Sequence, residues 1–146
     1  MDARYPLYFI DFSEGGCPQS APIEIAVASL QHAPEGIDTW VAETSDPGAI
    51  VKSMTDRFGP AAIFYTEDPD RTAHSMEKLL EDGGPSGDYN CRILHFSAAL
   101  APFFPGKSWP AETAKFQSTL TKVPPDPAAR AERLARLIGW IIAEPP

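Results

Sequence analysis

The chain has 146 residues, 43% of them hydrophobic and 22% charged, which predicts a single domain with one hydrophobic core. Its net charge of −8 at pH 7 repels polyanions and argues against a protein that coats DNA irrespective of sequence. No apolar run approaches the roughly 20 residues that span a bilayer, and no secretory signal is recognisable at the N-terminus, so we expect a cytoplasmic protein without a membrane segment.

The negative charge is concentrated in the first half of the chain. Residues 1–73 contain twelve acidic and four basic residues, whereas residues 74–146 contain eight of each. A solvated surface is the simpler interpretation, and a set of carboxylates that converge on a cation is the alternative.

Three strands are predicted in the first third of the chain. The run from Tyr5 to Phe12 is apolar at consecutive positions up to Asp11, which is typical of a strand buried on both faces. The β-branched run Ile23–Leu30 follows a loop that favours antiparallel pairing with the first strand. Thr39–Ala42 is predicted as a short third strand.

Hydrophobic periodicity and capping residues predict four further elements. They are a helix that begins at Pro47 and ends at Gly59, a strand at Ala61–Tyr65, a helix that begins at Asp70 or Thr72 and ends at Gly83, and a strand at Cys91–Leu94. The inward side chains expected on the second helix are Ala73, Met76, Leu79 and Leu80.

The last third of the chain is predicted to be mainly helical. The segment His95–Phe104 is ambiguous, and Ala111–Lys122 is expected to form a helix. A final helix follows the proline-rich run that ends at Pro127. Its expected inward residues are Ala131, Leu134, Ala135, Ile138 and Ile141.

Three strands followed by alternating helices and strands predict an α/β domain over residues 1–146, with a mixed five-stranded sheet flanked by helices. This order of elements is that of ribonuclease H-like domains. The runs Phe9-Ile10-Asp11-Phe12 and Pro22-Ile23-Glu24-Ile25-Ala26-Val27 resemble the opening of the DEDD-type 3′-5′ exonuclease family.

That resemblance implies a metal-dependent site. In the family, carboxylates hold two divalent ions, Mg²⁺ or Mn²⁺, which activate a water and stabilise the leaving oxygen. Asp11 matches the first of these acids, although an aspartate that merely ends a strand is the alternative. For an active enzyme, the resemblance implies metal ligands at Asp11, Glu14 and Asp70.

The sequence departs from the family pattern at the second acid and leaves alternatives at the third. Ser13 stands where the family has its first glutamate, and Glu14 is displaced by one residue, which reverses side-chain direction on an extended strand. Asp70 resembles the third acid, but a helix N-cap is an equal alternative for it. Asp68 competes for the same role.

The last helix departs further from the pattern. Alignment of its alanines places Pro125 at the general base and Arg130 at the fourth acid, and neither side chain can perform the family's chemistry. The same alignment predicts that the Arg130 guanidinium reaches Asp11 or Asp70 and stands in for the lost metal.

Basic residues on this helix are the candidate substrate-binding groups. Arg130 and Arg133, followed by Arg136, recur at three-residue spacing and could contact phosphates. A solvated helix face is the simpler interpretation of this spacing.

These observations predict a degenerate exonuclease-like domain, a pseudoenzyme with no cofactor. Its expected role is to bind single-stranded nucleic acid or a protein partner through the former active-site cleft. The alternative is an active 3′-5′ exonuclease that uses Mg²⁺ or Mn²⁺ at a displaced acidic site.

Overall fold

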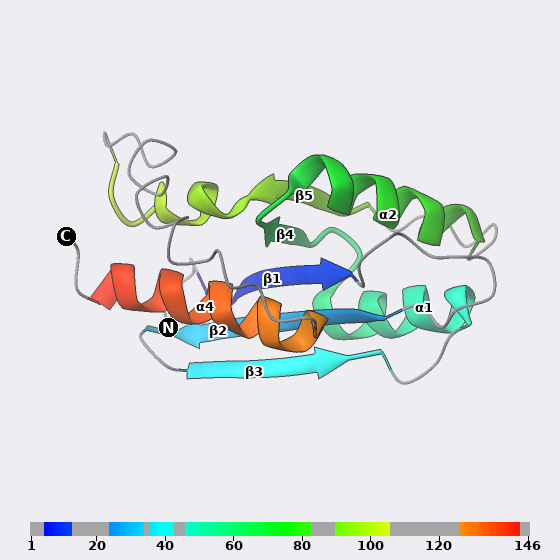
Figure 1. The fold of residues 1–146 in the computed structure, drawn as a ribbon, viewed down its shortest axis with the longest axis horizontal. Coiled ribbons are helices and arrows are strands. Elements are labelled where there is room, and N and C mark those ends of the chain that lie inside the picture. The colour runs from blue at the N-terminus through cyan, green and yellow to red at the C-terminus, as the bar shows by residue number, and fades with distance from the viewer. Residues whose placement is uncertain are drawn as a thin grey trace.

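The computed structural model describes residues 5–12, 24–33, 36–42, 46–82, 90–105 and 126–143. They form a mixed five-stranded sheet with helices on both faces (Figure 1), the α/β architecture predicted above and one consistent with a ribonuclease H-like fold. The elements are β1 (Leu7–Phe12), β2 (Ile25–His32), β3 (Gly36–Val41), α1 (Pro47–Phe58), β4 (Ile63–Thr66), α2 (Pro69–Asp82), β5 (Arg92–His95), the 3-10 helix η1 (Phe96–Leu100) and α4 (Pro127–Ala143).

The strand order β3-β2-β1-β4-β5 places β1 in the centre of the sheet. β1 pairs antiparallel with β2, as predicted from the loop between them, and parallel with β4. Because parallel strands end at the same edge of a sheet, the C-terminal ends of β1 and β4 lie side by side.

Successive side chains of β1 point to opposite faces of the sheet. Leu7 and Phe9 pack in the core cluster formed with η1 and α4. Ile10 and Phe12 pack in the second cluster, which α1 and α2 complete. The alternation directs Asp11 to the face covered by α4, which crosses the sheet in front of β1 and β2 in Figure 1.

The helices on the second face have clear boundaries. α1 begins at Pro47, as predicted, and ends at Phe58, followed by the C-cap Gly59, whose backbone φ of 89° suits a residue without a Cβ. α2 begins at Pro69 rather than at Asp70 or Thr72. The capping oxygen comes from Asp68, which accepts a hydrogen bond from the backbone N–H of Arg71 at 3.2 Å.

The inward face of α4 is confirmed. All five apolar residues predicted to point inward are buried, and Arg130 is buried with them. On α2 the prediction is wrong for Ala73, which is exposed, while Thr72 is buried instead. The helix predicted at Ala111–Lys122 lies outside the described residues. Among the helices described, none is long and apolar enough to cross a membrane.

The core contact of α4 is testable at Leu134, which is 1% exposed against β1 and β2. We expect Leu134→Ala to lower the free energy of unfolding by about 2–5 kcal/mol, because a buried cavity remains where the side chain was. Leu137→Ala, at a partly buried position of the same helix, is the matched control and should cost less. Urea denaturation followed by circular dichroism measures both, and equal losses would contradict the described packing.

Candidate functional site

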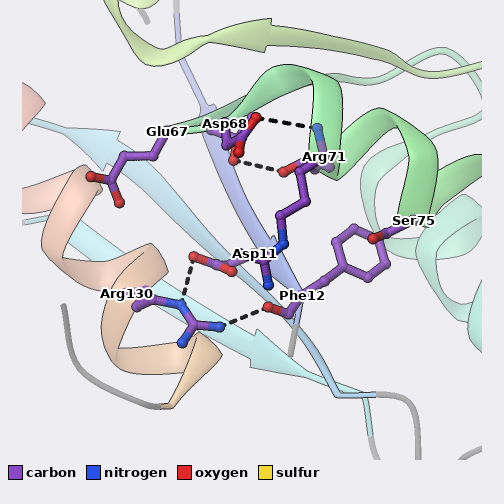
Figure 2. Close-up of a pocket in the computed structure, with 9 residues that line it drawn as sticks. Asp11, Phe12, Glu67, Asp68, Arg71, Ser75 and Arg130 are labelled. Atoms are coloured by element: carbon purple, nitrogen blue, oxygen red, sulfur yellow. Dashed lines mark hydrogen bonds and ion pairs between the residues drawn. The ribbon is translucent and has the colours of Figure 1, made fainter. Parts of the chain in front are cut away.

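A pocket of about 310 Å³ opens at the edge of the sheet where β1 and β4 end. It lies between the first turns of α2 and the start of α4 (Figure 2). Its lining residues are Asp11, Phe12, Thr66, Glu67, Asp68, Arg71, Thr72, Ser75 and Arg130. The lining therefore contains three carboxylates, two guanidinium groups and three hydroxyls.

The sheet brings two of these carboxylates together. Phe9 of β1 pairs in parallel register with Tyr65 of β4. Asp11 and Glu67 each follow two residues later, and the two-residue period of a strand directs both toward the same face. Each carboxylate therefore lies in the electrostatic field of the other.

The Arg130 guanidinium forms the principal contact of the site. Its Nε donates to Oδ2 of Asp11 at 2.9 Å, and its Nη2 donates to the Phe12 carbonyl oxygen at 2.7 Å (Figure 2). The Arg130 side chain is only 6% exposed and that of Asp11 19%. The contact between Arg130 and Asp11 expected from the sequence is confirmed, and it links the start of α4 to the end of β1.

The ion pair leaves Asp11 in an electrostatically costly position. Burial raises the pKa of Asp11, and the hydrogen bond and charge of Arg130 only partly oppose this effect. Ion pairs in such surroundings often give little net stability over apolar residues, although loss of one partner is costly. The pair is therefore weak evidence for added stability, although removing either partner would leave a buried charge alone.

Glu67 is the second carboxylate of the pocket with a raised pKa. Burial raises the pKa of Glu67, the neighbouring charge of Asp11 raises it further, and Arg133 and Arg130 oppose the shift. Among the described residues, Glu67 forms no hydrogen bond or ion pair. Sequence reasoning did not select it, although an acid directly after a strand parallel to the first strand is a usable signal.

The structure rearranges the predicted acids. Asp70 is exposed and is absent from the lining of the pocket, so the position that we assigned to it is occupied by Glu67 and Asp68. The reason is the early start of α2, which turns Asp70 outward. Glu14 lies outside the described residues.

Of the two basic residues predicted to bind substrate, only one lines the pocket. Arg130 is part of the pocket, whereas Arg133 is half-buried beside it and contributes positive charge near Glu67. Arg71 lines the pocket and was not selected from the sequence. Its side chain runs from α2 into the cleft toward Asp11 and Phe12 (Figure 2).

A buried pair of hydroxyls fixes α2 against the sheet. Thr66 Oγ1 at the end of β4 and Thr72 Oγ1 in α2 lie 3.0 Å apart, and both residues are buried. Arg71 and Ser75, one helical turn apart, are thereby held on the wall of the pocket.

Among the described residues, which do not include Glu14, the donor set does not form the two-metal site implied by the exonuclease resemblance. A guanidinium already contacts the Asp11 carboxylate. Within the described ranges, no group of three or more histidine, cysteine, aspartate or glutamate side chains is arranged to hold a metal ion. Divalent ions of this kind require several oxygen ligands, and a fixed cation beside the first ligand repels them.

Comparisons of the chain with family models, with curated proteins and with solved structures find no match. The function is therefore argued from the chemistry of the site.

The ion pair predicts an asymmetry among the arginines of α4. We expect Arg130→Ala to lower the free energy of unfolding by about 3–5 kcal/mol, because a buried carboxylate loses its partner. Arg133→Ala should cost less. Arg136→Ala, at an exposed position, should change it by about 0.5 kcal/mol or less. Chemical denaturation of the three variants measures the order, and an Arg130 variant as stable as the Arg136 variant would contradict the role of the pair.

Glu67 predicts a pH-dependent stability. The folded chain keeps the Glu67 proton to a higher pH than the unfolded chain, whose glutamates titrate near about 4.3. Stability is therefore lost as the pH rises through this range, and the loss is complete above the raised pKa. Glu67→Gln should be more stable than the parent at pH 7, and the advantage should vanish below about pH 4.

Thermal unfolding between pH 3.5 and pH 7 measures this difference. Glu77→Gln, on the exposed side of α2, controls for the change in net charge. An advantage of Glu67→Gln that is the same at all pH values would show that the raised pKa is not its cause.

Proposed function

We propose that this chain is a non-catalytic, ribonuclease H-like binding module that engages a protein partner through the cleft at the ends of β1 and β4. The observation that supports this proposal most directly is the contact between Arg130 and Asp11. It places a permanent cation against the carboxylate that a metal-dependent nuclease would need as a ligand.

The chemistry of arginine favours a lasting contact between Arg130 and Asp11 in place of a metal ion. A guanidinium stays protonated throughout the physiological pH range, and its planar donors suit a carboxylate. Arg130 is also held by the Phe12 carbonyl and is buried in the face that α4 packs against the sheet. Displacing it by a metal would leave a buried cation without its partner, at a cost of several kcal/mol.

Charge favours a protein partner over nucleic acid. The chain carries a net charge of −8, and the pocket lining has three carboxylates against two guanidinium groups. Of the predicted phosphate-binding residues, Arg130 already pairs with Asp11 and Arg133 lies near Glu67. Binding of the negatively charged phosphodiester backbone of nucleic acid requires an excess of positive charge in the site.

The proposal is tested with the full chain on labelled single-stranded DNA and RNA in the presence of Mg²⁺ or Mn²⁺. We expect no release of mononucleotides above background, since loss of a general base alone lowers rates by about a hundredfold to ten-thousandfold. Fluorescence anisotropy at low salt should also detect no binding of the single-stranded DNA or of the single-stranded RNA at micromolar protein concentrations.

The control variant is Asp11→Asn, which keeps the size of the side chain and removes its charge. Metal-dependent hydrolysis that disappears in this variant would overturn the proposal in favour of an active exonuclease. Binding of either nucleic acid without hydrolysis would keep the module non-catalytic and overturn the assignment of a protein partner.

A further inference from the structure

Two groups of opposite charge in the pocket form no hydrogen bond or ion pair with another described residue, although Arg133 and Arg130 act on Glu67 through their charge and Arg71 acts on Asp11. The Glu67 carboxylate forms no hydrogen bond or ion pair there, and the guanidinium of Arg71 forms none either. Both residues line the same cavity. Charged side chains that are left unpaired in a concave site are candidates for ligand contacts.

The remaining charges of the lining are already engaged. Asp11 and Arg130 neutralise one another at 2.9 Å. Asp68 accepts a hydrogen bond from the first turn of α2. The lining as a whole carries one more negative than positive charge, and the two groups without a hydrogen bond or ion pair to another described residue are one carboxylate, Glu67, and one guanidinium, Arg71.

These two groups lie on opposite sides of the Asp11–Arg130 pair. Figure 2 shows Glu67 extending toward α4, while the Arg71 side chain runs toward Asp11 and Phe12. Ser75, one turn after Arg71, adds a hydroxyl on the same wall. A ligand that satisfies both ends needs a cationic group, an anionic group and a short spacer between them.

The size of the cavity agrees with such a ligand. A volume of about 310 Å³ is at the lower end of the range for small-molecule sites, about 300–1,000 Å³. A simple cation would leave Arg71 without a partner, and a simple anion would meet the charges of Glu67 and Asp68. Binding of either simple ion would leave a charge in the pocket without an opposite charge or hydrogen-bond partner, which is unfavourable.

We infer that the pocket binds a short zwitterion, with its ammonium group beside Glu67 and its carboxylate on Arg71 and Ser75. Two sources share this chemistry: a partner segment with a lysine close to an acidic residue, and a free amino acid. This inference rests on the proposed binding function, and it assigns the kind of group that the cleft recognises.

The first experiment compares small probes by isothermal titration calorimetry with the full chain. The zwitterion 6-aminohexanoate is the test ligand, and pentylamine and hexanoate carry the two charges separately. We expect a dissociation constant of about 1 mM or below for the zwitterion. The single-charge probes should bind at least about tenfold more weakly, since each lacks one charged hydrogen bond. Equal binding of pentylamine, or no binding of 6-aminohexanoate, would overturn the inference.

The second experiment uses variants that remove one charge each. Glu67→Gln and Arg71→Gln should each weaken 6-aminohexanoate binding about tenfold or more, for the same reason. Arg57→Gln is the matched control, because Arg57 pairs with Asp38 outside the pocket. Circular dichroism verifies that each variant is folded. Unchanged affinity in both pocket variants would place the ligand elsewhere and contradict the assignment.

A third comparison distinguishes the two sources. An acetylated and amidated Lys-Ala-Glu peptide carries both charges on side chains and none at its ends. Tighter binding of this peptide than of 6-aminohexanoate would support a partner segment, and binding of 6-aminohexanoate alone would support a free amino acid whose amino and carboxyl groups lie at opposite ends of a short chain. Failure of both ligands would reject the zwitterion, whereas nuclease activity would reject the non-catalytic function, so the two failures are distinguishable.

Discussion

The contact between Arg130 and Asp11 determines how the rest of this site is arranged. It connects the central strand β1 to the last helix, and it places a fixed positive charge at the sheet edge where β1 and β4 end. Because the guanidinium also binds the Phe12 carbonyl, the orientation of α4 is set by charge as well as by apolar packing. The neighbouring Glu67 then experiences both the field of Asp11 and that of the arginines of α4.

Like many catalytic centres, this site holds ionisable groups with shifted pKa values close together. Two half-buried carboxylates lie close together, and burial raises the pKa of each. Replacement of buried ion pairs by apolar residues is often neutral or stabilising, so stability alone does not explain charged residues in these positions. In our proposal they serve recognition, with Glu67 and Arg71 supplying the two charges that a ligand would complement.

Much of the fold follows from local patterns in the sequence. The unbroken apolar run of β1 predicts a strand covered on both faces, and the period of Ala131, Leu134 and Ile138 predicts the buried side of α4. The position of Arg130 was predicted from the family resemblance, which aligns it with the fourth acid on that helix. The acids after β4 were harder to place, because the start of α2 at Pro69 depends on the Asp68 cap and moved Asp70 outward. The place of Arg71 in the pocket could not be predicted, since it depends on how α2 packs beside the end of β1 in the folded chain.

The separation of Arg130 from Asp11 by 119 residues has a consequence for folding during synthesis. β1, β2 and β4 are complete long before α4 emerges from the ribosome, so the apolar face around Phe9 and Ala28 remains exposed until the last helix packs on it. Contacts of such long range slow folding, because chain entropy is lost before the contact compensates for it. The nascent chain therefore carries an uncovered hydrophobic face between the synthesis of β2 and that of α4, and chaperones that bind such surfaces can act during that interval.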